Sequence, residues 1–387
     1  MAMPRVRIWL TPRVGRGSIY GRTFKGAFSR AVDRRSGSGS ARGLNTGGRF
    51  LLEESTMKGG MSRRELLAAG AAAGIGIAAA RSRAGAGEAA PAFKGRLLKA
   101  MIVGKTDEAT LKKAKDAGFD GVETNAWNVA PDEAKAGREA AEKAGLKIHA
   151  VLRGWMQFNS PDPAVVAKSI AETEVALRAA QGYGADALLL VPCRIGSKEM
   201  PMPEAWEFQL EFDEKTGHLA KVVPGDNAKY KAYIDAHNQA VDGSVAAVKK
   251  LIPVAEETKV VIALENVWNN LWVKPAYFRS FVASFASPWV KAYFDIGNHV
   301  KYAPPEEWLR TLGPLVVRCH VKDFKLNPDG HGGTFVNIRE GSVNWPLVRK
   351  VIDDIGYSGW MTHEHGGGQR LADDEIARRL DLIIAGK

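Results

Sequence analysis

From residue 96 onward the chain repeats one unit: a short apolar strand, a polar turn and an amphipathic helix. Apolar runs of strand length alternate with segments of helical periodicity, which is typical of parallel α/β folds. The eight expected strands lie at residues 97–103, 118–124, 146–152, 185–191, 259–265, 290–295, 316–322 and 360–364. Eight such units in about 290 residues predict a (β/α)8 TIM barrel, which normally takes roughly 250 residues, with one insertion.

The insertion lies after the fourth strand. Residues 194–228 carry mixed charge, with apolar residues on both sides of residues 213–217, so we expect a hairpin or similar excursion there. A helix over about 227–256 then resumes the repeat. An open doubly wound sheet is the alternative fold, but it calls for a glycine-rich phosphate loop after an early strand. The first strand is followed by Gly104-Lys105-Thr106-Asp107, which is no such loop.

The positive charge of the chain is confined to its first quarter. The whole chain carries +11, whereas residues 1–95 hold 17 Lys and Arg against 5 Asp and Glu, a net charge of +12. Residues 96–387 hold 37 basic and 38 acidic residues, a net charge of −1. A basic folded domain would suggest nucleic acid or an anionic membrane as a partner. The near-neutral body argues against a nucleic-acid partner.

The first 60 residues are rich in Arg, Gly and Ser and have no apolar period that would bury a face. We expect residues 1–60 to be a disordered basic leader. The alternative is a reading frame assigned too long, with Met57 or Met61 as the true start.

Residues 61–95 have the composition of a signal peptide and linker. Ser62-Arg63-Arg64 precedes a weakly apolar run at 66–80, and Ala84-Gly85-Ala86 suits a cleavage site. The segment resembles a twin-arginine export signal, which implies a periplasmic protein. A chance Arg-Arg pair beside an Ala-rich linker is the alternative, and the protein would then be cytoplasmic. No apolar run is long enough to predict a membrane span.

Four consecutive strands at the end of the barrel finish with a carboxylate or an imidazole: Glu265, Asp295, His320 and Glu364. Strand alternation lets all four point into the barrel while apolar neighbours face the helices. Active sites of such barrels lie at this end of the strands. Three crowded carboxylates repel one another unless a cation lies among them. With one imidazole they suit a divalent ion, Mn²⁺ first and otherwise Mg²⁺, Co²⁺ or Zn²⁺. Alone, each residue would more simply be a helix cap or an ion-pair member.

The segments around these residues resemble the sugar phosphate isomerase/epimerase family of the xylose-isomerase-like TIM barrels. The similarity spans about residues 96–385 and is carried by Ala263-Leu264-Glu265-Asn266, Phe294-Asp295-Ile296-Gly297-Asn298, His320-Val321-Lys322-Asp323 and Gly356-Tyr357-Ser358-Gly359-Trp360 before Glu364. It implies a metal site at Glu265, Asp295, His320 and Glu364. It also implies that Glu265 and Glu364 act as the catalytic acid/base pair.

Three further residues are candidates for sugar binding. Glu123 and His149 end the second and third strands with inward parity, and suit hydrogen bonds to sugar hydroxyls. Local structure is an equally good explanation of both. Trp155 suits stacking on a sugar face, although most tryptophans are core residues.

Two more candidates depend on the resemblance. In epimerases of this branch a histidine often lies three residues after the aspartate, but Asn298 stands there and His299 comes one residue later. His299 is therefore a candidate for substrate contact at a position shifted by one residue. Lys322 shares the parity of His320, and it would either neutralise an enediolate or pair with Asp323.

The sequence therefore predicts a metal-dependent sugar or keto-sugar isomerase or epimerase that works through an enediolate. A lyase or dehydratase on a keto-sugar, keto-glycoside or keto-inositol would use the same metal and base, and the sequence does not separate the two. A DNA-repair endonuclease would need more histidines at strand ends, and a non-catalytic sugar binder would not need both glutamates. The expected partner is a small sugar, while a homo-oligomeric state, the identity of the sugar and its phosphorylation stay open.

Overall fold

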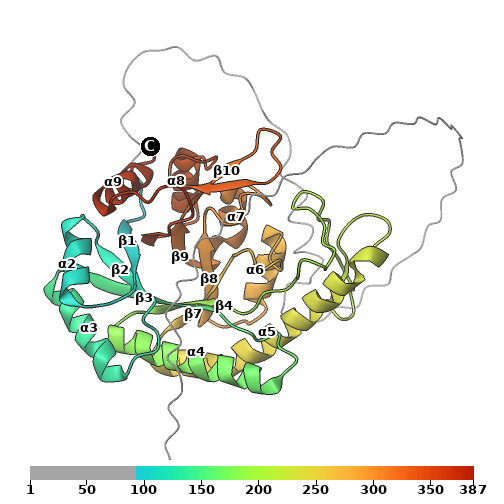
Figure 1. The fold of residues 1–387 in the computed structure, drawn as a ribbon, viewed down its shortest axis with the longest axis horizontal. Coiled ribbons are helices and arrows are strands. Elements are labelled where there is room, and N and C mark those ends of the chain that lie inside the picture. Colours follow the sequence, from blue (N-terminus) through green and yellow to red (C-terminus); the bar gives the residue numbers. More distant parts are fainter. Residues whose placement is uncertain (1–92) are drawn as a thin grey trace, which may run out of the picture. The chain divides into compact units, whose positions relative to one another are not determined.

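Eight parallel strands close into a barrel in the computed structural model, which describes residues 93–387 (Figure 1). Around the barrel their order is β1-β12-β9-β8-β7-β4-β3-β2. Their bounds are β1 (Leu97–Val103), β2 (Gly121–Thr124), β3 (Lys147–Trp155), β4 (Ala187–Val191), β7 (Val261–Glu265), β8 (Val290–Asp295), β9 (Val316–Val321) and β12 (Gly359–His363). The predicted TIM barrel is confirmed.

Helices follow the strands and form the outer layer of the barrel. They are α2 (Glu108–Asp116), α3 (Pro131–Lys143), α4 (Pro163–Tyr183), α5 (Lys231–Thr258), α6 (Pro275–Ala283), α7 (Pro305–Leu312), α8 (Trp345–Asp354) and α9 (Asp373–Ile384). Local signals set several of their ends. At the start of α4 the Asp162 carboxylate accepts a hydrogen bond from the Ala164 amide, and at its end Gly184 takes a left-handed φ of 69°.

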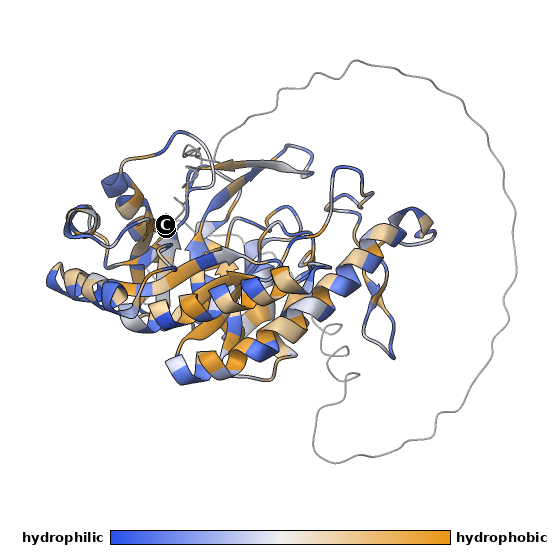
Figure 2. Ribbon diagram, turned by 60° about the horizontal axis from the view of Figure 1, so that its bottom comes forward, coloured by the Kyte–Doolittle hydropathy of each residue, from blue (hydrophilic) through white to orange (hydrophobic). Residues whose placement is uncertain are grey.

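The core has two parts because strand residues alternate between the two faces of the sheet. One face packs against the helices, where Leu264, Phe294, Cys319 and Met361 join a large apolar cluster. The other face fills the barrel interior with a small cluster of Ala150, Ala187, Leu189, Val191, Ala263 and Tyr293. Figure 2 shows hydrophobic colouring on the strands and alternating colouring along the helices. The apolar neighbours of the four strand-end residues thus face outward, as their parity predicts.

Two hairpins extend from loops that follow barrel strands. The predicted insertion contains β5 (Glu211–Phe212) and β6 (Leu219–Lys221), which pair antiparallel. The amide side chain of Asn238 on α5 bonds both the N–H and the C=O of Leu219, and this fixes the hairpin to the helix. A second hairpin of β10 (Asp323–Leu326) and β11 (Gly333–Val336) follows β9, and the sequence patterns did not predict it.

The two excursions meet through one aromatic contact. Trp206 of the insertion stacks on His331 in the β10–β11 turn, with ring centroids 4.0 Å apart and planes 15° apart. The insertion follows β4 and the β10–β11 hairpin follows β9. In the strand order of the barrel, β7 and β8 lie between these two strands. The pair therefore joins loops that belong to non-adjacent strands.

Residues 93–95 pack against the barrel. The amides of Lys94 and Gly95 both donate to the Asp353 carboxylate, and the Arg349 guanidinium lies 3.7 Å from the centroid of the Phe93 ring. The last three residues of the expected linker are thus part of the barrel's outer layer. The predicted leader at 1–60 and the signal segment lie outside the described residues.

None of the helices in the described part of the chain is long and apolar enough to cross a membrane.

Candidate metal centre

Glu265, Asp295, His320 and Glu364 come together at the carboxyl ends of β7, β8, β9 and β12. One potential ligand atom from each lies within 4.8 Å of the others. Asp295 and His320 are 0% and 1% exposed, and Glu265 is 6% exposed, whereas Glu364 is partly open to solvent. The geometry matches a small cation site that is closed on the barrel side and open on the Glu364 side.

The His320 ring lies at the centre of this cluster. Its Nδ1 atom is 2.9 Å from Glu364 Oε2, 3.5 Å from Glu265 Oε1 and 4.0 Å from Asp295 Oδ2. Its other nitrogen, Nε2, is 2.9 Å from the carboxylate of Glu123. Nδ1 is therefore the nitrogen that faces the three carboxylates.

Backbone and amide groups fix the direction of Asp295. One oxygen, Oδ1, accepts hydrogen bonds from the amides of Gly297 and Asn298 at 2.8 and 2.7 Å. The side chain of Asn266 bonds the Asp295 backbone on both sides, accepting from its N–H and donating to its C=O. The second oxygen, Oδ2, is left to face the cluster.

The donor set fits a divalent cation. Among the described residues, Asp295 Oδ2, His320 Nδ1 and Glu364 Oε2 are buried and make no hydrogen bond, and their charged neighbours are one another and the Lys322 ammonium. Buried polar atoms without partners are uncommon and call for an explanation. Carboxylate oxygens and one imidazole nitrogen are ligands that Mn²⁺, Mg²⁺, Co²⁺ and Zn²⁺ accept. These four residues are thus the ones that would hold a metal.

Burial and neighbouring charges push the carboxyl groups of the cluster in opposite directions. Burial raises the pKa of Glu265 above its usual value, and burial raises that of Asp295 to about 7 despite the nearby Lys322 ammonium. Burial also opposes ionisation of Glu364, but the charges of Lys322 and His320 outweigh it and lower the pKa of Glu364 far below its usual value. Carboxyl groups with separated pKa values suit acid and base roles.

Glu123 occupies a different place from the expected sugar contact. It is fully buried, and its Oε2 accepts hydrogen bonds from the Tyr293 hydroxyl at 2.6 Å and from His320 Nε2 at 2.9 Å. We therefore correct its role from contacting sugar to holding the imidazole. Burial disfavours a charged His320, but the carboxylates of Glu123 and Glu364 outweigh this and raise its pKa well above the usual value.

His149 also lies below the mouth of the barrel. The β2–β3 register skips it, because Val122 pairs with Ile148 and Glu123 pairs with Ala150. Its ring stacks on Trp360 with centroids 4.5 Å apart, and its Nε2 lies 3.0 Å from the Thr362 hydroxyl. The bulge leaves His149 fully buried, so the expected sugar contact is corrected to a packing role.

His299 points away from the cluster. Its Nε2 lies 2.9 Å from the backbone oxygen of Val267, and its ring packs against Tyr302 and Trp308. Burial lowers its pKa to about 3, so the ring is neutral. The expected substrate contact of His299 is corrected to a structural role, because the turn after β8 directs its ring into the helical layer.

Lys322 joins the cluster and does not pair with Asp323. Its ammonium is 2.9 Å from Glu364 Oε2 and 3.2 Å from Asp295 Oδ2, and it donates to Asn298 Oδ1 at 3.1 Å. Asp323 faces the loop at 337–345 and accepts from several of its backbone amides and from the Trp345 indole.

Asn298 is the site residue for which sequence reasoning assigned no role. Besides holding Lys322, its side-chain amide donates to Glu265 Oε1 at 3.3 Å. Its place three residues after Asp295 was the available signal. Tyr293 and Thr362 also lie in the barrel interior, where they contact each other. Their inward direction could have been predicted from the sequence, because each stands two residues before a strand-end acid.

Trp155 is the last residue of β3 and is 45% exposed. The guanidinium of Arg194 lies 5.4 Å from the centroid of its ring. An exposed indole at the carboxyl end of a barrel strand is available for stacking, so the sugar contact of Trp155 stays a prediction.

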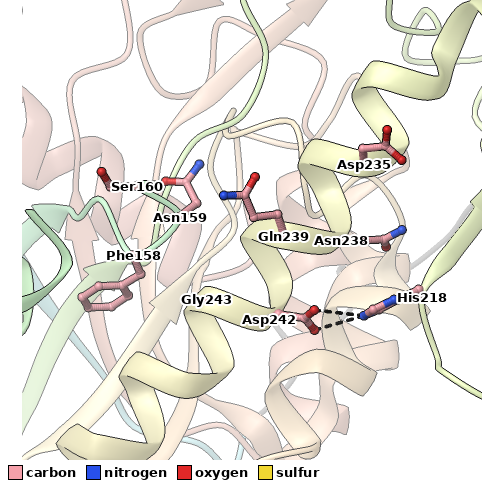
Figure 3. Close-up of a pocket in the computed structure, with 9 residues that line it drawn as sticks. All are labelled: Phe158, Asn159, Ser160, His218, Asp235, Asn238, Gln239, Asp242 and Gly243. Atoms are coloured by element: carbon pink, nitrogen blue, oxygen red, sulfur yellow. Dashed lines mark hydrogen bonds and ion pairs between the residues drawn. The ribbon is translucent and has the colours of Figure 1, made fainter. Parts of the chain in front are cut away.

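A separate polar groove of about 580 Å³ lies between the loop after β3 and the first half of α5 (Figure 3). An ion pair between His218 and Asp242 closes one side of it. Its lining is Phe158, Asn159, Ser160, His218, Asp235, Asn238, Gln239, Asp242 and Gly243. Since the four cluster residues are not part of this lining, we assign the chemistry to the cluster and not to the groove.

Comparison of the sequence with models of protein families identifies the family of this barrel. The model of the xylose isomerase-like TIM barrel family matches residues 111–382. The chain belongs to this family. All four cluster residues lie within the matched range. No curated protein matches the chain in sequence.

Several solved structures share the fold at low sequence identity. A 3-keto-D-glucoside 4-epimerase from E. coli has a TM-score of 0.55 at 13% identity, covering 74% of this chain and 99% of that one. A D-tagatose 3-epimerase-like protein has a TM-score of 0.55 at 17% identity, covering 74% and 98%. A xylose isomerase-like TIM barrel protein from Mycobacterium smegmatis, in complex with magnesium, has a TM-score of 0.52 at 17% identity, covering 76% and 98%.

Proposed function

We propose that the protein is a divalent-metal-dependent sugar or keto-sugar epimerase or isomerase. The observation that carries this proposal is the cluster of Glu265, Asp295, His320 and Glu364, whose ligand atoms lie within 4.8 Å of one another at the active end of the barrel. The family membership and the sugar epimerases among its fold neighbours support the same reaction class. Mn²⁺ is the metal we expect first.

A bound divalent cation would act as a Lewis acid, polarising a substrate carbonyl and acidifying the neighbouring C–H. The chain's own residues then have two tasks. One glutamate, Glu265 or Glu364, removes the proton from carbon as a carboxylate, and the C–H electron pair forms the double bond of an enediolate. The other glutamate, as a carboxylic acid, returns a proton.

The position of proton return decides the product. Return to the same carbon from the opposite face inverts its configuration, which is epimerisation. Return to the neighbouring carbon gives aldose–ketose isomerisation. The partial exposure of Glu364 against the burial of Glu265 supports two proton routes that enter from different sides.

The experiment is isotope incorporation by the Mn²⁺-loaded full chain in D₂O with a panel of ketoses and 3-keto-glycosides. We expect deuterium at one carbon of the recovered sugar, and loss of turnover by at least about 10³-fold in Glu265→Gln and Glu364→Gln. Glu139→Gln, at an exposed position on α3, is the matched control and should be unchanged. Removal of metal by a chelator should stop exchange, and Mn²⁺ should restore it.

Two results would contradict this proposal. The first is an absence of deuterium incorporation with every sugar of the panel. The second is release of water or an aglycone in place of reprotonation, which would assign the same site to a lyase or dehydratase.

We further propose that the segment at residues 61–95 exports the protein to the periplasm. The support is the Ser62-Arg63-Arg64 sequence ahead of the apolar run at 66–80.

A further inference from the structure

A lysine is buried against the residues that would hold the metal. Lys322 follows β9 directly and is 7% exposed. Its ammonium lies 2.9 Å from Glu364 Oε2 and 3.2 Å from Asp295 Oδ2. Burying an ammonium is costly unless it is paired, and these two carboxylates provide the pairing.

The fold provides a narrow slot for the stem of this side chain. A Cβ on Gly297 would lie 2.7 Å from the backbone carbon of Lys322, and one on Gly366 would lie 2.8 Å from its Cγ. The Phe335 ring of the β10–β11 hairpin closes a third side, with its centroid 5.3 Å from the ammonium. Three separate loops therefore fix the position of one cation.

The ammonium also has an uncharged anchor, the side chain of Asn298. Asn298 Oδ1 accepts a hydrogen bond from it at 3.1 Å, while the amide nitrogen of the same side chain donates to Glu265 at 3.3 Å. An ammonium has three N–H donors. One of them is on Asn298, and the other two face Glu364 and Asp295. These two would become available to a substrate oxygen where a bound divalent cation takes over the two carboxylates.

Charge counting shows what this cation contributes. The three carboxylates of Glu265, Asp295 and Glu364 carry −3 when ionised, and a divalent metal brings this to −1. Lys322 brings the loaded site to neutrality. Proton abstraction from carbon adds one negative charge to a substrate oxygen, and a fixed donor aimed at that charge lowers the barrier.

We propose that Lys322 is a catalytic residue of this site: its ammonium, held by Asn298, donates a hydrogen bond to the substrate oxygen on which negative charge forms. This inference rests on the proposed epimerase or isomerase function. It differs from a purely structural ion pair, which would stabilise the fold without affecting the chemical step.

The first test needs no substrate. A positive charge beside the ligands opposes a divalent cation, so Mn²⁺ titration of the full-length chain by calorimetry should give at least tenfold tighter binding in Lys322→Met. Lys322→Arg keeps the charge and should stay closer to wild type. Lys325→Met, at an exposed position three residues along, is the matched control. Unchanged or weaker binding in a folded Lys322→Met protein would overturn the assigned position of the charge.

The second test measures proton exchange in D₂O. Removing a preorganised donor costs roughly 10²–10³-fold in rate, so we expect a loss of this size in Lys322→Met. In Lys322→Ala, added ethylammonium should restore part of the rate, while ethanol of similar size should not. A structural role would give no such selective rescue.

The outcomes separate the two proposals. Exchange by wild type together with at least half of that rate in Lys322→Met would refute the role of Lys322 and leave the proposed function standing. A wild-type protein without exchange would refute both. If Lys322→Met does not fold, the comparison of ethylammonium with ethanol in Lys322→Ala decides the same question.

Discussion

The carboxylate of Glu123 orients the imidazole that the cluster presents to a metal. It accepts a hydrogen bond from His320 Nε2 at 2.9 Å, and the Tyr293 hydroxyl fixes the same oxygen at 2.6 Å. Metal-binding histidines commonly donate their second ring N–H to a carboxylate, which sets the tautomer and raises ligand basicity. Glu123 therefore acts through His320 and not on a substrate.

We predict that Glu123→Gln weakens Mn²⁺ binding by about 10- to 100-fold, because a neutral amide replaces the carboxylate that orients His320. Calorimetric titration measures the change. Tyr293→Phe removes the second donor but keeps the carboxylate, and should cost less affinity. Equal Mn²⁺ affinity in Glu123→Gln and wild type would show that Glu123 does not set the His320 geometry.

For single residues, the sequence predicts which face of a strand a side chain lies on better than it predicts how deeply that side chain is buried. The inward parity of Glu265, Asp295 and His320 follows from strand alternation, a local property that a single chain displays. The depth of His149 depends on a bulge against β2, and the direction of His299 depends on the turn after β8. Both are set by contacts with other segments, so neither could be predicted locally.

Among the elements, the turn after β8 must pass very close to the backbone of Lys322, which directly follows β9. A Cβ on Gly297 would lie 2.7 Å from both the carbonyl carbon and the oxygen of Lys322. Backbone atoms cannot move away as the end of a side chain can. Glycine at this position therefore allows β8 and β9 to bring Asp295 and Lys322 together.

We predict that Gly297→Ala destabilises the fold by about 1–3 kcal/mol, the usual cost of forcing an extra carbon into a packed site. Urea denaturation followed by circular dichroism would measure it. Gly104→Ala is the matched control, since its Cβ would meet nothing nearer than Asn125 at 3.8 Å. If both variants unfold at the same urea concentration as wild type, the close approach at Gly297 is not a constraint.

Element boundaries show the same division between local and distant causes. The first strand was predicted to the residue, whereas β3 runs on to Trp155 because it pairs with β4 up to Val191. The insertion at 194–228 was visible as an interruption of the repeat. The β10–β11 hairpin was not, because its strands are only four residues each and surround a polar, glycine-rich turn.

For the whole molecule, the strand–helix repeat was sufficient to predict the barrel because each unit uses only short-range patterns. The packing of residues 93–95 could not be predicted in the same way. Phe93, Lys94 and Gly95 lie in the Gly- and Ala-rich segment and have no strand or helix periodicity of their own. Their place is set by Asp353 and Arg349 of α8, more than 250 residues away in sequence.

We therefore predict that a chain starting at residue 93 is more stable than one starting at residue 96. The shorter chain loses two hydrogen bonds to Asp353 and the Phe93 ring over Arg349, whose guanidinium also donates to the Gly95 oxygen. Losing these contacts should lower the melting temperature by several degrees.

Differential scanning calorimetry of both chains beside the full-length protein would measure this difference. A chain starting at residue 93 with Phe93→Ala separates the contribution of the ring from that of the backbone amides, and should melt between the other two. Because these contacts lie on α8, on the helical layer, Mn²⁺ affinity should be the same in all of them. Equal melting temperatures for the two starts would show that residues 93–95 do not stabilise the fold.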